Sequence, residues 1–388
     1  MASIKNLLII HLSPFFSPNI GGVETYLDDL TAIISQNNLN QIVITYSPLT
    51  SSLRAPIYTQ NQKSKITIFR FPHFGGNLFH RLEKKPLLNF LYLTPYLFIV
   101  SFFVSLFKIR RHIVFHAHGL NSAFIGLLLK KVFHRPLIVN IYSSYDNVPF
   151  TPLFLNVIKK VLNQADFVLT QSNDSLCSLK SIGINEKILD LYHHWIDLSR
   201  FKPHSLSKVP KNFLFIGRLI PQKGVRLVLK LALLFPKLNF LIVGKGPDYP
   251  KALKLSKTLT NLKLFGEVPY HDLHLYYQMA DIFLFPSLYA EGWGRTAMEA
   301  VACGLPVLGS NLGAIPENLD PSVSILFKPT LKNFQEHLTL IAKSPKTYFE
   351  LQKNCRPYAL KHFSTKNFSN LKNIYLSTLA SLPAKTGF

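Results

Sequence analysis

The stretch AEGWGRTAMEA, residues 290–300, holds two carboxylates, Glu291 and Glu299, on either side of a glycine-containing turn. The glycines predict a loop, and the residues after them predict a helix that begins near Arg295. The first N–H groups of a helix have no partner within it, so they can bind a phosphate. Glu299, one turn into this helix, can accept hydrogen bonds from two vicinal hydroxyls, and Glu291 can bond other hydroxyls. The segment therefore suits a ligand that joins a sugar, a diphosphate and a ribose.

Two cations follow a predicted strand near the middle of the chain. The sequence IGRLIPQKG, residues 216–224, places Arg218 and Lys223 just beyond that strand. A planar guanidinium fork beside an ammonium group suits a diphosphate, although an ordinary turn with solvated cations would look the same. The glycine-rich strand end VGKGPDY, residues 243–249, would let the backbone approach a nucleotide, but such turns are common in α/β folds.

Two motifs in the first half could also bind a ligand. The sequence GGVE, residues 21–24, opens a helix whose free N–H groups could bind an anion; tight packing is the alternative. In HAHG, residues 116–119, His116 and His118 share one side of a strand, and we expect His118, nearer the loop, to face a cleft. A metal site would need a further ligand that the sequence does not reveal, so we predict none. Hydrogen-bonded structural histidines are the alternative.

The elements that must position these residues alternate between strands and helices in both halves of the chain. In the first half the apolar strands are KNLLIIHLSP, NQIVITYSP, KITIFRFP, HIVFHAHG, PLIVNIYS and DFVLTQS; in the second half they are NFLFIGRL, LNFLIVGKGP, LKLFGEV, DIFLFPS and PVLGSN. Near-continuous apolar strands between helices indicate parallel sheets covered on both faces. The sequence therefore predicts two doubly wound α/β domains, with ligands bound in a cleft between them, beyond the carboxyl ends of the strands.

The predicted boundaries follow from this alternation. Residues 1–190 form the first domain and 212–363 the second, and the proline-rich, polar segment 191–211 is the expected linker. A last helical segment, 364–382, is expected to pack back on the first domain.

Composition narrows the class of protein. The chain has 388 residues, 48% of them apolar, which excludes global disorder. Its net charge of +23 indicates anionic partners such as nucleic acid, phosphorylated ligands or anionic lipid. The alternative is that the charge only keeps the protein soluble. The basic residues are scattered, without a dense nucleic-acid-binding tract. Cys177, Cys303 and Cys355 form no CxxC pair, which argues against disulfides and structural zinc and for a reducing compartment.

The segment 86–107, PLLNFLYLTPYLFIVSFFVSLF, contains no charge and is followed by KIRRH. It is long enough to span a bilayer, but polar residues and a proline interrupt it and a strand follows directly. We therefore expect a buried or membrane-surface helix in preference to a spanning one. The apolar run at the N-terminus is too short for a signal peptide, and it reads better as a first strand.

The segment EGWGRTAMEAVACGLPVLGSNLGAIPE resembles the E-x7-E signature of retaining GT-B glycosyltransferases of the family 4 type (glycosyl transferases group 1). Supporting blocks occur in the family's order: GGVETYLDDL, FHAHG, ADFVLTQS, HHWIDLSRFKP, IGRLIPQKG, LIVGKGP, LFGEV and ADIFLFPS. The resemblance runs from about residue 5 to about residue 365. It implies two Rossmann-like domains that face each other across a cleft.

The resemblance implies four catalytic residues. Arg218 and Lys223 would clamp the donor diphosphate and stabilise the leaving group. Glu291 would bind the transferred sugar, and His118 would lie by the reacting carbon and bond the sugar or the acceptor. Neither Glu291 nor Glu299 is expected to be a covalent nucleophile, because the family retains configuration through same-face attack.

The resemblance implies further contacts with the donor. Gly22 would contact the diphosphate through its backbone, Glu299 would bind the ribose hydroxyls, and Val268 would lie near the base. The backbone of Gly294, Arg295 and Thr296 would touch phosphate or sugar. No metal or other cofactor is expected, because two cations already neutralise the diphosphate.

The sequence departs from the family pattern in places. NNLNQIVI replaces the usual GH-x-V, and HHWID stands where an Asn-Gly turn is common. NIYSSYD stands where a histidine often follows a threonine-rich strand, which puts ligand contacts in the first domain in doubt.

The sequence thus predicts a retaining hexosyltransferase that uses a UDP- or GDP-sugar and a hydroxyl acceptor, expected to be a lipid-linked or surface-polysaccharide precursor. The charge and the apolar segment fit a cytoplasmic protein that docks on an anionic membrane surface. A sugar-nucleotide hydrolase, phosphorylase or epimerase of the same fold is the alternative. A non-enzymatic nucleic-acid-binding protein is a remote one, because charge alone is an unspecific signal.

Overall fold

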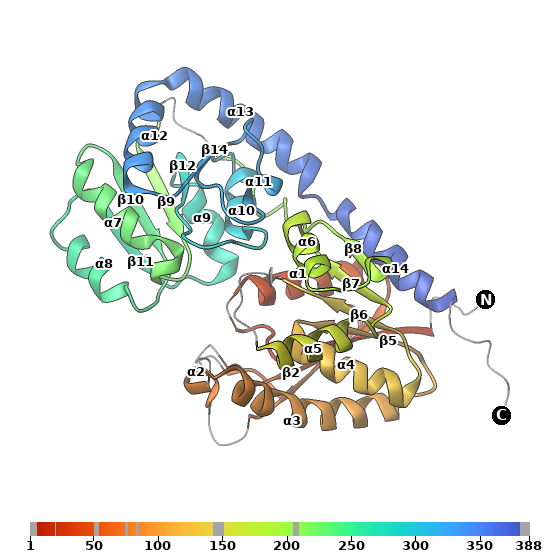
Figure 1. The fold of residues 1–388 in the computed structure, drawn as a ribbon. Helices are drawn as coiled ribbons and strands as arrows, with labels where there is room; N and C mark the ends of the chain where they lie inside the picture. Colours follow the sequence, from red (N-terminus) through yellow and green to blue (C-terminus); the bar gives the residue numbers. More distant parts are fainter. Residues whose placement is uncertain are drawn as a thin grey trace. The chain divides into compact units, whose positions relative to one another are not determined.

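The computed structural model describes residues 6–19, 21–49, 54–73, 77–82, 85–142, 151–204 and 209–380. The chain divides into two compact units (Figure 1). The first comprises Met1–His193 and Asn367–Phe388, and the second comprises His194–Lys366. Each unit is built on one sheet, so the expected α/β class is confirmed.

The first unit contains an eight-stranded sheet in the order β3-β4-β2-β1-β5-β6-β7-β8. All neighbouring strands run parallel except the antiparallel pair β3 and β4. The strands are β1 Leu7–Leu12, β2 Asn40–Tyr46, β3 Tyr58–Asn61, β4 Ile66–Phe71, β5 His112–His118, β6 Leu137–Asn140, β7 Phe167–Thr170 and β8 Leu189–Leu191. Every residue of β1 is buried, as expected for a parallel strand with helices on both faces.

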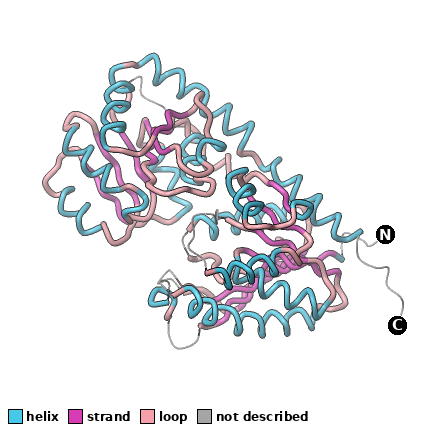
Figure 2. Tube along the Cα trace, in the orientation of Figure 1, coloured by secondary structure: helices cyan, strands magenta, loops and turns pink. Residues whose placement is uncertain are grey.

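Helices separate most strands of the first unit along the chain, although β2, β3 and β4 follow one another directly. Figure 2 shows the helices in cyan and the strands in magenta. The helices are α1 Gly22–Gln36, α2 Phe79–Leu82, α3 Pro86–Phe107, α4 Leu120–Phe133, α5 Pro152–Leu162, α6 Asn173–Ser181 and α14 Phe368–Ala380, with the short 3₁₀ helix η2 Glu186–Ile188. The last helix, α14, belongs to this unit although it comes from the far end of the chain.

The second unit contains a six-stranded parallel sheet in the order β11-β10-β9-β12-β13-β14. Its strands are β9 Asn212–Ile216, β10 Asn239–Val243, β11 Leu262–Gly266, β12 Ile282–Phe285, β13 Val307–Ser310 and β14 Ser324–Phe327. Its helices are η3 Pro221–Lys223, α7 Val225–Leu234, α8 Tyr249–Ser256, η4 Tyr270–Asp272, α9 Leu273–Tyr277, α10 Arg295–Ala302, α11 Ile315–Asn318, α12 Leu331–Lys343 and α13 Pro345–His362; η5 Thr365–Asn367 follows them.

Both sheets reverse their strand order at one point. The second sheet has the Rossmann order, in which the first strand β9 lies beside the fourth strand β12. In the first sheet the corresponding neighbours are β1 and β5. Ligands of doubly wound sheets bind beyond the carboxyl ends of the strands at such a switch point. A ligand site is therefore expected at the loops that follow these four strands.

The segment expected as a linker, 191–211, is partly built into the second unit. The division between the units falls after His193, and Ile196 and Phe201 lie fully buried in the second unit's core. The Ile196 N–H donates to the carbonyl of Phe363, which fixes this segment against the end of α13. Of the described residues in 191–211, those from His194 onward thus belong to the second unit.

Helix α3 is long and apolar enough to cross a membrane, with a mean hydropathy of 2.0 over Leu87–Phe107. It nevertheless packs on α4 and β2, with Leu93 and Leu97 in the core of the first unit. Its exposed surface is also apolar, and its large exposed side chains lie in two groups, one near the start and one near the end of the helix: Leu87 and Leu91, then Ile99, Phe103, Leu106 and Phe107. The helix is therefore neither fully buried nor covered on all sides within the described part of the chain.

Candidate functional site

The loop that carries Glu291 follows β12, at the switch point of the second sheet. Glu291 forms an isolated parallel bridge with Gly313, and its carbonyl accepts the Ala314 N–H at 3.0 Å. Gly294 caps α10 with φ at 64°, and a Cβ there would lie 2.5 Å from the Ile315 side chain. A side chain at position 294 would therefore strain the turn that leads into α10.

Lys223 and Glu291 form a close ion pair at this switch point. Lys223 Nζ lies 2.6 Å from Glu291 Oε1, with side chains 23% and 9% exposed respectively. Ser287 Oγ also donates to Glu291 Oε1, and Tyr289 Oη donates to Oε2 at 3.1 Å. Burial is the largest single influence on Lys223 and opposes its charge, but the charges and hydrogen bonds of Glu291 and Tyr289 together raise the pKa of Lys223. The pair is thus a charged, hydrogen-bonded cluster.

Glu299 is buried, 1% exposed, and its carboxylate already has protein partners. Tyr270 Oη and Arg295 Nε donate to Oε1, both at 3.1 Å, and Tyr277 Oη donates to Oε2 at 2.9 Å. The Tyr277 hydroxyl is also 3.0 Å from the carbonyl oxygen of Thr296. The acids at both ends of the E-x7-E spacing therefore accept hydrogen bonds from hydroxyl groups, and a sugar would offer donors of the same kind.

Other residues that the sequence predicted as donor contacts also lie beyond the carboxyl ends of strands, each in its own sheet. Arg218 is exposed and follows β9, where the Leu219 N–H donates to the carbonyl of Lys245 at 2.8 Å. Val268 follows β11 and is partly buried against the second unit's core. Gly22 begins α1 in the first unit, and a Cβ there would meet no atom within 4 Å. The space around Gly22 leaves its backbone accessible to a ligand.

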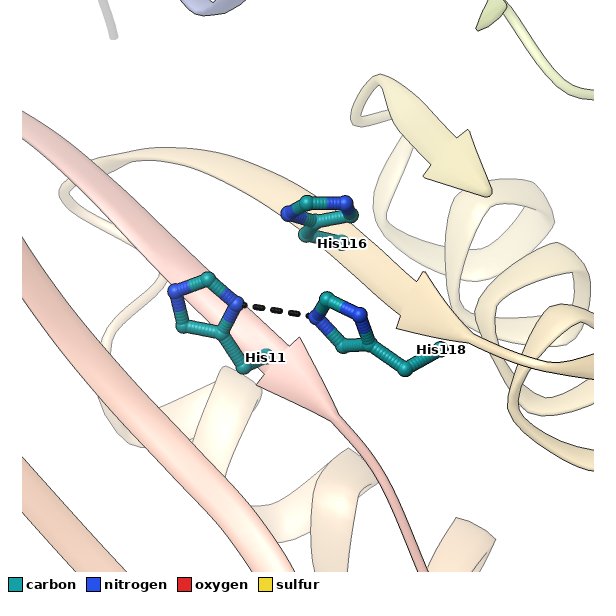
Figure 3. Close-up of side chains that lie close together, drawn as sticks. All are labelled: His11, His116 and His118. Atoms are coloured by element: carbon teal, nitrogen blue, oxygen red, sulfur yellow. Dashed lines mark hydrogen bonds between the residues drawn. The ribbon is translucent and has the colours of Figure 1, made fainter. Parts of the chain in front are cut away.

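The first unit brings three histidines together at its own switch point (Figure 3). His11 on β1 pairs in register with His116 on β5, and His118 lies two residues further along β5. The ring centroids of His116 and His118 are 4.2 Å apart, and both rings are within 5.4 Å of His11. All three are buried, and His118, which the sequence predicted to face a cleft, is only 4% exposed.

Each of these rings is hydrogen-bonded. His11 Nδ1 lies 3.1 Å from His118 Nε2, and His118 Nδ1 lies 2.6 Å from the hydroxyl of Tyr142. His116 bonds the Tyr375 hydroxyl at 2.6 Å and Asn140 Oδ1 at 3.0 Å. Burial lowers the pKa of all three histidines, that of His116 to about 4. The cluster is uncharged at neutral pH.

Comparison with known families gives two matches that together span residues 20–362. The model of Glycosyltransferase Family 4 matches residues 20–200, and that of Glycosyl transferases group 1 matches residues 199–362. The chain is a GT-B glycosyltransferase of the family 4 type. The fold, the family and the enzyme class expected from the sequence are confirmed.

Relatives of this glycosyltransferase include a human phosphatidylinositol N-acetylglucosaminyltransferase subunit, which is 24% identical over 94% of this chain and 74% of the relative. The D-inositol 3-phosphate glycosyltransferase of Mycobacteroides abscessus is 29% identical over 44% of this chain and 43% of its own. Among solved structures, sucrose-phosphate synthase from Thermosynechococcus elongatus has a TM-score of 0.81 at 20% identity, covering 97% of this chain and 100% of that one. Anabaena HepE in complex with UDP has a TM-score of 0.74 at 19% identity over the same shares.

The three histidines of the glycosyltransferase also form a group whose ligand atoms lie within 4.8 Å of one another. Three neutral imidazoles could hold zinc or a similar ion. However, both nitrogens of His116 and both nitrogens of His118 already have hydrogen-bonding partners, and no carboxylate belongs to the group. The cluster is better described as a hydrogen-bonded polar core.

Sequence reasoning missed several residues of both clusters. His11 lies near the end of the first strand predicted from the sequence, but only the strand order places it beside His116 and His118. Tyr142 lies in NIYSSYD, the segment that departs from the family pattern. The hydroxyls around the acids, from Ser287, Tyr289, Tyr270 and Tyr277, carry no motif, since only the fold brings them to the carboxylates.

Proposed function

We propose that this glycosyltransferase transfers a hexosyl group, with retention of configuration, from a UDP- or GDP-sugar to a hydroxyl acceptor. The observation that carries the proposal is the 2.6 Å pair of Lys223 and Glu291 beyond β9 and β12. A cation for a diphosphate and an acid for sugar hydroxyls meet there, close in sequence to the N-terminus of α10. The structures of HepE with UDP and with UDP-glucose support this class of donor.

In the proposed complex, the donor diphosphate takes the place of Glu291 beside Lys223, and Arg218 provides the second cation. Glu291 then accepts hydrogen bonds from the transferred sugar. The backbone N–H groups at Gly294, Arg295 and Thr296 add partial positive charge from the start of α10. Together these groups stabilise the diphosphate as it leaves, without a metal ion.

The remaining contacts are proposed on the same basis. Glu299 accepts the ribose hydroxyls in exchange for tyrosine hydroxyls, Val268 lies near the base, and Gly22 approaches the diphosphate through its backbone. His118 bonds the sugar or the acceptor only if it gives up one of its present partners, His11 or the Tyr142 hydroxyl, to a substrate hydroxyl. The acceptor attacks from the face that the diphosphate leaves, so configuration is retained without a covalent enzyme intermediate.

We also propose that the acceptor is lipid-linked or a surface-polysaccharide precursor, reached at the cytoplasmic face of a membrane. The exposed apolar surface of α3 supports this, because water does not favour six large apolar side chains on one helix. Lys108 and Arg110 follow directly and are exposed, which suits anionic headgroups. The relatives described above include enzymes named for phosphatidylinositol and inositol phosphate acceptors.

A thermal-shift panel of UDP, GDP, ADP and their sugar conjugates, without metal, tests the donor. At a concentration of 100 Kd, a bound nucleotide stabilises the folded state by about 2.7 kcal/mol. We expect one nucleotide to raise the Tm, the Lys223→Ala variant to lose the shift, and the exposed Lys237→Ala variant to keep it. No shift with any nucleotide, or an equal shift in Lys223→Ala, would contradict the proposed site.

Product analysis and flotation test the reaction and the membrane surface. The anomeric configuration of the product, read by NMR, must match that of the donor; free sugar alone would indicate a hydrolase. We expect flotation with anionic vesicles, lost in Phe103→Glu and kept in Leu233→Glu, which changes an equally exposed leucine on α7. Equal flotation of both variants would exclude α3 as the membrane contact.

A further inference from the structure

We propose that the Tyr270 hydroxyl covers the Glu299 carboxylate in the ligand-free protein, and that a ribose hydroxyl of the donor takes its place. This proposal rests on the proposed function, which gives Glu299 the ribose. Of the tyrosine hydroxyls around Glu299, that of Tyr270 is the one that leaves, so its presence weakens donor binding. We call Tyr270 the tyrosine cover.

The Glu299 carboxylate is closed to a ligand in this conformation. The residue is 1% exposed, and its oxygens accept from Tyr270 Oη and Arg295 Nε, both at 3.1 Å, and from Tyr277 Oη at 2.9 Å. A buried carboxylate that loses a donor pays for the loss unless another donor replaces it. A ribose hydroxyl can therefore reach Glu299 only in exchange for one of these groups.

Two of the three donors are poorly suited to leave. Arg295 forms an ion pair with Glu299, with side chains 10% and 1% exposed, and removing the cation from a buried carboxylate costs more than removing a neutral hydroxyl. Tyr277 is fully buried in the core of the second unit, and its hydroxyl also lies 3.0 Å from the carbonyl oxygen of Thr296. Both groups therefore belong to the fixed wall of the carboxylate.

The tyrosine cover is the donor that can leave. Tyr270 is partly exposed and begins the short helix η4, which follows β11. Its oxygen accepts from Arg295 Nη2 at 2.7 Å, so a hydroxyl that leaves Glu299 can keep this partner while water accepts its proton. Val268, proposed to lie near the base, is two residues away, so a bound nucleoside would lie on the side of Glu299 that Tyr270 covers.

The ring of the tyrosine cover has contacts of its own, which do not involve the hydroxyl. The guanidinium carbons of Arg200 and Arg295 each lie 5.5 Å from the centre of the Tyr270 ring, within the range of a cation–π contact. The ring of Phe201 lies 5.7 Å from it. A phenylalanine at position 270 keeps these contacts, so Tyr270→Phe empties the hydroxyl position and leaves the ring in place.

Titration calorimetry with UDP and GDP tests the exchange. In the wild type a ribose hydroxyl replaces a hydrogen bond that already exists, whereas in Tyr270→Phe it supplies a missing one. We expect Tyr270→Phe to bind the nucleotide about twofold to tenfold more tightly, and inorganic pyrophosphate, which has no ribose, with unchanged affinity. Tyr277→Phe should not tighten binding, because a ribose cannot reach its position. Tyr276→Phe, a partly buried neighbour that packs on Phe265, is the matched control and should bind as the wild type does.

Fluorine NMR of the full chain, with 3-fluorotyrosine at position 270 alone, tests the movement without relying on the folding of a variant. We expect the signal to shift when the nucleotide binds and to stay in place with pyrophosphate. Equal or weaker nucleotide binding by Tyr270→Phe, equally tighter binding of pyrophosphate, or a signal that does not respond to bound nucleotide would overturn the tyrosine cover and leave the proposed donor site intact. If neither UDP nor GDP binds the wild type, the proposed function fails together with the cover.

Discussion

The pair of Lys223 and Glu291 should couple measurably in a double-mutant cycle of Lys223→Met and Glu291→Gln. At 2.6 Å and an effective dielectric constant of about 20, the gross attraction is about 6 kcal/mol. Desolvation of two mostly buried charges offsets much of it, and contacting pairs typically retain a coupling of about 0.5–3 kcal/mol. We expect about 1–3 kcal/mol here, since Ser287 and Tyr289 also hold the carboxylate.

The assay is thermal unfolding of the four proteins of the cycle without ligand. For a unit of 150–250 residues, about 1 kcal/mol corresponds to 2–4 °C in Tm, so Lys223→Met should lower the second unit's Tm by about 3–10 °C. The double variant should recover part of that loss, because Glu291→Gln removes the uncompensated charge. The exposed pair Lys245 and Glu267, 3.9 Å apart, is the matched control and should show no measurable coupling. Additive effects at Lys223 and Glu291 would refute the reasoning.

Three further outcomes follow from the structure. Gly224→Ala should lower the Tm of the second unit by several degrees in a thermal melt, because φ is 72° and a Cβ would lie 1.9 Å from the Pro286 carbonyl oxygen; an unchanged Tm would contradict this. The first unit should lose stability on acidification. In the unfolded state His116 binds a proton near pH 6.5, whereas in the folded state, where its pKa is about 4, it binds that proton only near pH 4. From pH 7 to pH 5 this one group costs about 2 kcal/mol, and denaturant titrations at both values, with a smaller slope in His116→Gln, measure it. Of the three free cysteines, only exposed Cys177 should react quickly with a thiol reagent in the native protein, and all three after unfolding, since burial raises the pKa of the other two thiols; rapid reaction of all three without denaturant would argue against the packed core.

The sequence predicts most strands and the turn between Glu291 and Glu299 well, because both are local signals. Every apolar strand named from the sequence is present, and α10 begins at Arg295 as the glycines indicated. Short or polar elements were missed, such as β3, which is largely exposed, and α6, whose mean polarity hides its buried face. The hydroxyls around Glu291 and the partner of His118 on β1 depend on strand order, which no local pattern contains.

The membership of α14 in the first unit has a consequence for the order in which the protein is made. On a ribosome the second unit is complete before the first one, because the residues from Asn367 onward, which belong to the first unit, emerge after Lys366. Until then His116 lacks the hydroxyl of Tyr375, one of its two hydrogen-bond partners, and the polar core between β5 and α14 stays open. A chain that terminates between Lys366 and Tyr375 therefore contains the whole second unit, although it began later, but leaves the first unit without a hydrogen-bond partner of His116.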